Sequence, residues 1–168
     1  MRHPRPSVAP GLCYGRLDLD LHAEGVADIA RVRDVLAGFA AECVWTSPAR
    51  RCRLLADALG RPVRVDARLQ EMDFGHWEGR SWNEIDRAAL DRWAAAPLNF
   101  APPGGESGAA LIARVRAFAA ELRDDCIVIS HGGPLKILAA LLSGRAVDLL
   151  AATPAFGAVE MITVSPAG

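Results

Sequence analysis

The stretch Cys126-Ile127-Val128-Ile129-Ser130-His131-Gly132-Gly133 decides the fold class of this chain. Its short apolar run, rich in β-branched residues, predicts a strand over 126–130. The two glycines end the strand and let a ligand approach the backbone closely, and a helix is predicted from about Pro134. A strand followed at once by a helix indicates a β–α unit with His131 at the carboxyl end of the strand, although a histidine that merely caps the turn fits equally well.

Outward from this unit, helical periodicity and short apolar runs alternate along the chain. Apolar residues three and four apart, together with capping residues, predict further helices over 22–42, 47–60, 81–93 and from 106 to about 122. Other short apolar runs predict strands over 43–46, 62–65 and about 158–164. This alternation predicts an α/β fold, a three-layer α/β/α sandwich whose mostly parallel central sheet is covered on both faces.

Serine residues are predicted to start several of these helices. Ser47 precedes Pro48 and is expected to be the N-cap of the helix that follows the strand 43–46. Ser81 and Glu84 have the spacing of a capping box. Residues 1–21 and 66–80 show no period and are predicted to be irregular.

Length, charge and composition limit the kind of protein that the sequence encodes. The 168 residues are predicted to form a single domain over 1–168. A net charge of −1 argues against a nucleic-acid partner, and no apolar run approaches the length of a membrane-spanning helix. The N-terminus lacks the apolar stretch of a secretory signal, so a cytoplasmic location is expected. The scattered cysteines argue against disulfides and structural zinc.

Three further places gather side chains suited to chemistry. Arg50 and Arg51 follow a predicted strand on the first turn of a helix, where an anion would offset their charge against the helix dipole. The loop 69–79 combines acids, a histidine and aromatics, and apolar neighbours there would raise a carboxyl pKa. Arg2 and His3 open the chain. Each place alone also fits an ordinary surface position.

The combination of these motifs, in this order, resembles the histidine phosphatase superfamily, also called the phosphoglycerate-mutase-like family. The resemblance covers nearly the whole chain and depends on five motifs: Arg2-His3, Ser47-Pro48-x-x-Arg51, Glu71-x-x-Phe74-Gly75-x-Trp77-Glu78-Gly79, Pro103-Gly104-Gly105-Glu106-Ser107 and Ser130-His131-Gly132. Residues 8–18 further resemble a segment of the α-ribazole phosphatases of cobalamin assembly, which remove phosphate from α-ribazole 5′-phosphate.

The resemblance implies a phosphoglycerate-mutase-like fold and a phosphomonoester hydrolase that works through a phosphohistidine. It makes His3 the nucleophile, Glu71 the general acid and His131 the partner of His3 in the phosphate pocket. The phosphate would be bound by Arg2, Arg51 and Gly132. Arg5, Tyr14, Arg16 and Trp77 are candidates for shaping the leaving-group pocket, although a scaffold role fits the tryptophan equally well. No metal or other cofactor is implied, and the partner would be a small phosphorylated metabolite.

Two features depart from the family pattern. The family has a β-strand immediately before Arg-His, whereas only Met1 precedes Arg2 here, so either the true start lies upstream or His3 lies on a less restrained terminus. Pro4 replaces the usual glycine and lacks an N–H that would otherwise be available to the phosphate. Two alternatives therefore stay open: a phosphoglycerate mutase-type phosphotransferase, and a non-catalytic protein that binds a phosphorylated ligand.

Overall fold

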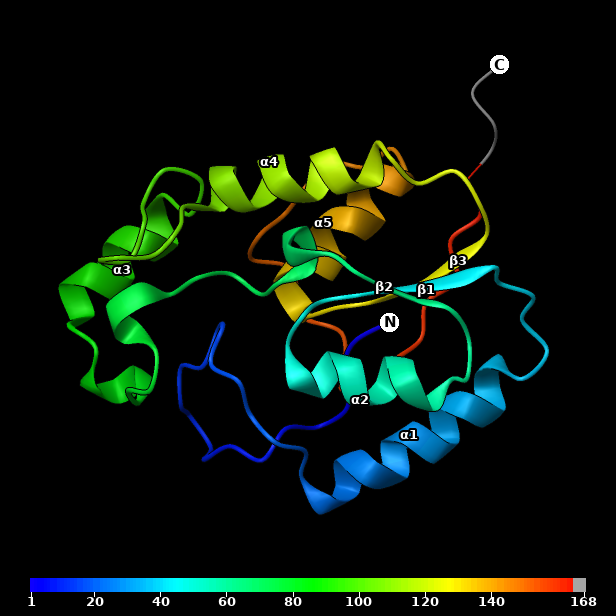
Figure 1. Ribbon diagram of the computed structural model, residues 1–168. Coiled ribbons are helices and arrows are strands. Elements are labelled where there is room, and N and C mark those ends of the chain that lie inside the picture. Colours follow the sequence, from blue (N-terminus) through cyan, green and yellow to red (C-terminus); the bar gives the residue numbers. More distant parts are fainter. Residues whose placement is uncertain (165–168) are drawn as a thin grey trace.

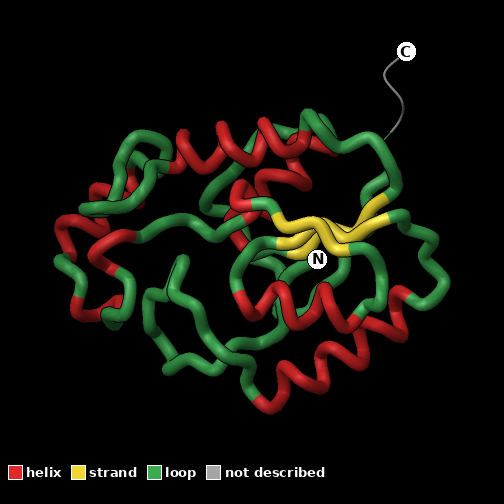
Figure 2. Tube along the Cα trace, in the orientation of Figure 1, coloured by secondary structure: helices red, strands yellow, loops and turns green. Residues whose placement is uncertain are grey.

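Three parallel strands form the centre of the structure, with helices above and below them (Figure 1, Figure 2). The computed structural model describes residues 1–164. The strands are β1 (Cys43–Thr46), β2 (Val63–Val65) and β3 (Cys126–Ile129), and β1 lies in the middle, parallel to both neighbours. In the register of β1 with β3, Cys43 lies opposite Cys126 and Thr46 opposite Ile129. The predicted α/β class and parallel sheet are confirmed.

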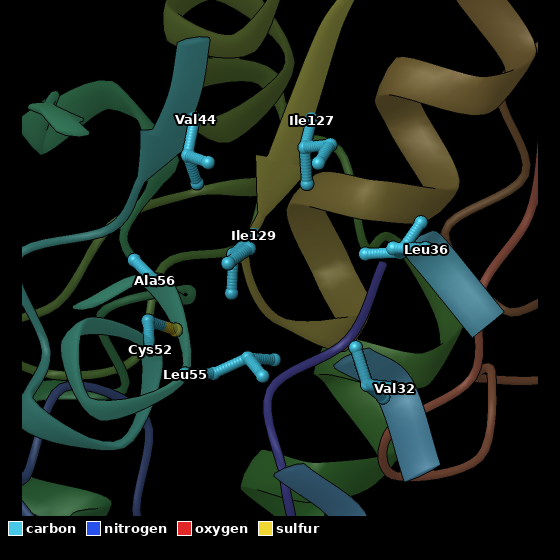
Figure 3. Close-up of a cluster of buried hydrophobic side chains, with 8 residues drawn as sticks. All are labelled: Val32, Leu36, Val44, Cys52, Leu55, Ala56, Ile127 and Ile129. Carbon is cyan, nitrogen blue, oxygen red and sulfur yellow. The ribbon is translucent and has the colours of Figure 1, made fainter. Parts of the chain in front are cut away.

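Two apolar clusters hold helices against the two faces of the sheet. On one face lie α1 (Ala23–Leu36) and α2 (Arg50–Ala58), and on the other α4 (Gly108–Ala119) and α5 (Gly132–Leu142). The first cluster consists of Val32, Leu36, Val44, Cys52, Leu55, Ala56, Ile127 and Ile129 (Figure 3). The second consists of Leu69, Met72, Leu111, Val115, Phe118, Ile137 and Leu138. Val44 packs into the first cluster and its neighbour Trp45 against the second, as the pleat of a strand requires, and the predicted three layers are confirmed.

A third cluster lies to one side of the sheet, around α3 (Arg87–Ala95) (Figure 1). Short 3₁₀ helices lead into it: η1 (Ala67–Leu69), η2 (Gly75–Trp77) and η3 (Trp82–Glu84). We call its ring-bearing members the aromatic cluster, which consists of Phe74, Trp77, Trp82, Trp93 and Phe100. Because Phe74 and Trp77 belong to the loop 66–80, the aromatic cluster anchors that loop although most of it has no regular structure.

The N-terminal residues extend the sheet beside β3. Arg2 forms a parallel bridge with Ser130, and the His3 amide donates to the Ser130 carbonyl at 3.0 Å. On the other side, the Gly157 amide donates to the His3 carbonyl at 3.2 Å. The expectation of a less restrained terminus at His3 is therefore wrong, because backbone hydrogen bonds hold this residue from both sides.

Several predicted helix limits are wrong. The helix predicted from Ser47 begins at Arg50, because the Ser47 amide donates to the Ile129 carbonyl and so continues the strand pairing. The helix predicted to reach residue 42 ends at Leu36, two residues before Gly38, and glycine is a poor helix former. The capping box at Ser81 is present, but it starts η3, and the side chain of Asp86 caps α3 separately.

The strand predicted over 158–164 is also wrong: within these residues the structure contains no strand. Two backbone hydrogen bonds join this part of the chain to the N-terminal segment, between Arg2 and Ala158 and between Gly157 and His3. A β-strand would need a longer series of regular backbone hydrogen bonds to its neighbour than these two. Among the described residues, no helix combines the length and hydropathy needed to cross a membrane.

Candidate active site

His3, Arg51 and His131 meet at the carboxyl end of the sheet. His3 lies beside β3, His131 follows β3 as the N-cap of α5, and Arg51 lies on the first turn of α2 after β1. All three residues are at most 1% exposed. The centres of the two imidazole rings are 5.0 Å apart, with an angle of 61° between the ring planes. The topology thus pairs two histidines that lie near opposite ends of the sequence.

The surroundings of His3 keep its ring neutral and define its tautomer. Nδ1 lies 2.7 Å from the Pro4 carbonyl oxygen, and because a carbonyl only accepts, Nδ1 carries the hydrogen. Nε2 consequently holds a lone pair. Burial, together with the positive charge of Arg51 and Arg2, lowers the pKa of His3 from 6.5 to about 3. A neutral imidazole with an unprotonated Nε2 is the form that can act as a nucleophile.

Arg51 and Ser47 orient His131 in the same way. The Arg51 Nη2 lies 3.1 Å from His131 Nδ1, and because a guanidinium can only donate, Nδ1 is the acceptor. The ring hydrogen of His131 is therefore on Nε2, which donates to Ser47 Oγ at 2.8 Å. Burial and the charge of Arg51 lower the pKa of His131 well below its usual value. Arg51 is held in turn by the carbonyls of Gly15 and Leu17, at 2.8 and 2.7 Å.

The two neighbouring arginines on α2 have different environments. Arg50 is exposed and pairs with Asp20 at 2.9 Å, whereas Arg51 points into the site. Arg2 donates from Nη1 to the Pro154 carbonyl at 2.7 Å, and its guanidinium carbon lies 3.9 Å from the centre of the Phe156 ring. Arg2 and Arg51 each keep a buried Nε without a hydrogen-bond partner among the described residues. An unsatisfied buried donor is costly, and an anion between the two arginines would satisfy both.

Glu71 faces the start of α5. Its carboxylate accepts from the amides of Gly133, at 3.2 Å, and Met72, at 3.0 Å. A Cβ added at position 133 would lie 2.5 Å from the Glu71 Oε1, so a larger residue there would displace this carboxylate. The carboxylate therefore lies at the N-terminus of a helix, directly beside the turn that carries His131 and Gly132.

A partly buried ion network holds the backbone of Glu71. Arg114 on α4 donates from Nη2 to the Glu71 carbonyl at 3.0 Å and to Glu106 Oε1 at 2.6 Å. Arg16 pairs with Glu106 at 3.2 Å and with Asp73 at 3.1 Å. The network fastens the segment 71–73 to α4, so the general acid predicted from the sequence is carried by a restrained loop.

A cavity of about 200 Å³ opens beside Glu71. Its polar lining residues are Arg2, Glu71, Gly132, Gly133, Lys136 and Thr153. Its apolar lining residues are Met72, Phe74, Trp93, Pro97, Leu111, Leu149 and Leu150. Arg2 and Gly132 belong both to this lining and to the surroundings of the paired histidines. The cavity therefore combines a few charged groups with a mainly apolar lining.

A family model described as the histidine phosphatase superfamily (branch 1) matches residues 1–163. The chain belongs to this superfamily. A glucosyl-3-phosphoglycerate phosphatase from Mycolicibacterium vanbaalenii is 31% identical over 167 residues, which cover 88% of this chain and 74% of the relative. A putative phosphoserine phosphatase from Hydrogenobacter thermophilus is 29% identical, over 83% of this chain and 74% of the relative. The crystal structure of the α-ribazole phosphatase from Shigella flexneri is similar with a TM-score of 0.80 and 27% identity, over 88% of this chain and 79% of that chain.

The residues of this histidine phosphatase that were predicted to bind and transfer phosphate come together. His3, His131 and Arg51 lie together, and Gly132 opens α5 next to His131. Arg2 lines the same cavity as Gly132 and Glu71, and Glu71 accepts from the Gly133 amide. Pro4 lacks an N–H, as noted from the sequence, but it keeps the carbonyl that orients His3. The substitution therefore spares the interaction that determines the tautomer.

The four residues predicted to shape the leaving-group pocket do not line the cavity in the part of the histidine phosphatase chain that the structure describes. Arg5 pairs with Glu24 at the surface, Tyr14 lies against Arg51, and Arg16 belongs to the ion network. Trp77 is buried in the aromatic cluster. Packing of aromatic rings occupies Trp77 and ion pairing occupies Arg5 and Arg16, and a role of these four residues toward the leaving group stays a prediction.

Most of the residues that line the cavity were not among the site residues predicted from the sequence. Lys136 could have been found, because it lies three residues after Gly133 and hence on the same face of α5. Trp93 was assigned only to the end of a helix. Leu149 and Leu150 lie in a segment without any periodic signal, and only the tertiary structure places them beside Glu71.

The lowered pKa of His3 predicts a pH-dependent stability. The unfolded chain takes up a proton near pH 6.5, whereas the folded state does so only near pH 3, so the unfolded state binds more protons in this window. The free energy of unfolding should therefore fall as the pH is lowered through it, by up to about 1.4 kcal/mol per pH unit from His3. Urea unfolding at neutral pH and at about pH 5 measures this, and His3→Gln should show a shallower dependence. An equal slope in both proteins would contradict the assignment.

Proposed function

We propose that this protein is a phosphomonoester hydrolase that forms a phosphohistidine on His3. The observation that carries the proposal is the pairing of a neutral, buried His3 with His131 at 5.0 Å, beside Arg2 and Arg51. The buried Nε groups of both arginines support an anion at this place. Membership of the histidine phosphatase superfamily, whose relatives here are named as phosphatases, agrees with it.

The chemistry proceeds in two displacements. Nε2 of His3 attacks the phosphorus of the monoester, the bond from phosphorus to the ester oxygen breaks, and Glu71 gives its proton to the departing alkoxide. Glu71 then takes a proton from water, whose oxygen attacks the phosphohistidine and releases inorganic phosphate. Arg2, Arg51 and the Gly132 amide at the start of α5 stabilise the charge on the other phosphate oxygens.

A direct test combines turnover with trapping of the intermediate. The protein should release phosphate from an aryl phosphate, and a ³²P-labelled substrate should leave label on His3 after rapid quenching. Addition of a chelator should leave the rate unchanged. Binding of phosphate without label or turnover would instead favour the non-catalytic alternative, and interconversion of 2- and 3-phosphoglycerate without net release of phosphate would favour the mutase alternative.

Arg51→Met should lower kcat/KM for an aryl phosphate by about 10²–10³, because a preorganised charge partner of the phosphate is lost. The same change removes the hydrogen bonds to Gly15, Leu17 and His131, so thermal unfolding should be measured alongside and the assay run well below the midpoint. Arg50→Met is the matched control, since Arg50 is the exposed neighbour on the same turn. Equal rates in the two variants would remove Arg51 from the phosphate site.

For the physiological substrate we propose α-ribazole 5′-phosphate, which would place the enzyme in the assembly of cobalamin. Residues 8–18 support this choice by their resemblance to α-ribazole phosphatases, and so does the similarity to the Shigella enzyme of that name. The other relatives are named after phosphoserine and glucosyl-3-phosphoglycerate. A comparison of kcat/KM for these three esters decides between them, and a preference for either of the latter two would reject α-ribazole 5′-phosphate.

A further inference from the structure

We infer that the cavity beside Glu71 selects monoesters whose leaving group is uncharged and apolar, that Leu149 and Leu150 form the selective wall, and that Lys136 holds this wall in place. The inference rests on the proposed function, because that function puts the departing ester oxygen next to Glu71. With the phosphate held between His3 and Arg2, the rest of the substrate must extend past Glu71 into this cavity.

Besides Leu149 and Leu150, the apolar lining of the cavity includes Phe74, Trp93 and Leu111. Phe74 and Trp93 present rings that are fixed by their neighbours, since their centres lie 5.9 Å apart at 76° and Trp93 also stacks on Trp82 at 6.2 Å. Leu111 is 1% exposed and belongs to the core cluster on this side of the sheet. A charged group pressed against such a wall would lose its hydration without gaining a partner. An apolar group would gain from leaving water.

Lys136 lines the cavity, but the backbone uses most of its hydrogen-bonding capacity. Its Nζ donates to the carbonyls of Leu149, at 2.7 Å, and Ala151, at 2.8 Å. Two of the three donors of the ammonium group are thereby used on the backbone of a single short segment. Lys136 therefore acts as a tie between α5 and the residues 149–151, rather than as a receptor for a carboxylate of the substrate.

Leu149 is also held in place by its contact with the start of α4. A Cβ added at Gly108, the first residue of α4, would lie 2.3 Å from the Leu149 Cδ1, so this leucine is seated closely against the start of that helix. Leu150 lines the cavity while remaining 61% exposed. The hydrogen bonds from Lys136 and the contact of Leu149 with Gly108 thus hold the segment 149–151 in place. This segment places Leu150 at the mouth of the cavity.

The apolar lining favours some of the esters that appear in the names of the relatives over others. Phosphoserine and glucosyl-3-phosphoglycerate both carry a carboxylate, which needs a cation or several donors when it leaves water. The cavity of this protein has a mainly apolar lining, and two of the three donors of its lysine are already used by the backbone. An uncharged leaving group with an apolar body fits this wall better.

The test compares primary alkyl phosphates, whose alkoxide leaving groups differ little in chemistry. We expect kcat/KM for phenethyl phosphate to exceed that for ethyl phosphate by about 10- to 100-fold, which is the scale expected for burying a phenyl group. Phosphoserine should be no better than ethyl phosphate. A wild-type protein that hydrolyses these esters but prefers phosphoserine overturns the inference and leaves the proposed function standing. A protein inactive on all of them, and on aryl phosphates, contradicts the proposed function and the inference with it.

Leu150→Arg tests the wall by adding a cation at its mouth. It should lower kcat/KM for phenethyl phosphate and raise it for phosphoserine, each by roughly tenfold, the scale of one exposed charge or one partly buried side chain. Val26→Arg is the matched control, because Val26 is also 61% exposed but lies on α1, on the other side of the sheet. Equal behaviour of the two variants would overturn the role of Leu150.

Lys136→Met tests the tie, since methionine keeps much of the stem and removes the ammonium group. It should raise KM for phenethyl phosphate several-fold more than KM for ethyl phosphate, because only the larger leaving group depends on the position of Leu149 and Leu150. A loss confined to phosphoserine would show that Lys136 binds the carboxylate, and it would overturn the inference.

Discussion

His3→Ala is expected to lower the hydrolysis of an aryl phosphate by at least about 10⁴-fold, because the nucleophile and the covalent intermediate are both lost. His3 is the residue whose environment is most strongly arranged for this role. It is 1% exposed, its Nδ1 is occupied by the Pro4 carbonyl, and its pKa is lowered to about 3. The measurement is the rate of phosphate release, together with ³²P labelling, which should disappear in the variant.

His76→Ala provides the control for this prediction. His76 is an exposed histidine in the loop 66–80, and its ring lies near Gly104 rather than in the site. It should keep the wild-type rate and labelling. Full activity in His3→Ala would end the phosphohistidine mechanism, and label retained in that variant would move the intermediate to another residue.

Glu71→Gln is expected to have the second largest effect, and its size should depend on the leaving group. A proton delivered to the departing oxygen matters most for a poor leaving group, so hydrolysis of ethyl phosphate should fall by about 10²–10⁴-fold. An ester of a strongly acidic phenol leaves without that help, and the rate of its first displacement, measured as a burst, should change by less than about tenfold. The amide oxygen can still accept from Gly133 and Met72, so the fold should be unaffected.

Glu42→Gln is a suitable control, because Glu42 is an exposed carboxylate just before β1. A loss in Glu71→Gln that is the same for good and poor leaving groups would show that Glu71 supports the structure of the loop and does not donate the proton. Such a result would leave the assignment of His3 intact.

The fold class could be predicted because both faces of the sheet are covered. Val44, Ile127 and Ile129 pack on one face while Trp45 and Val128 pack on the other, so each strand is an apolar run that stands out between helices. The predicted limits failed where local and tertiary preferences compete. Ser47 has the chemistry of a cap, but its amide is used by the strand pairing.

Part of the candidate site could likewise be predicted from the sequence, and part of it could not. Arg51 and His131 closely follow β1 and β3, and parallel strands bring the positions after them to one edge of the sheet, so the convergence of these two residues followed from the topology. His3 joins them because its backbone pairs with Ser130 beside β3. The leaving-group pocket did not follow. Trp77 lies in a motif but packs among aromatic rings, whereas Leu150 lies in no motif and lines the cavity.

The sequence by itself determined the layered α/β fold, because this depends on periodicity. Through their resemblance to the histidine phosphatases, its short motifs also indicated the family and the groups that are proposed to meet a phosphate. Only the tertiary structure decided the protonation and tautomer of His3 and His131, the restraint on Glu71 and the apolar wall opposite it. Burial and hydrogen-bond partners set a pKa, and distant segments set the shape of a cavity. Neither is encoded by residues that are neighbours in the chain.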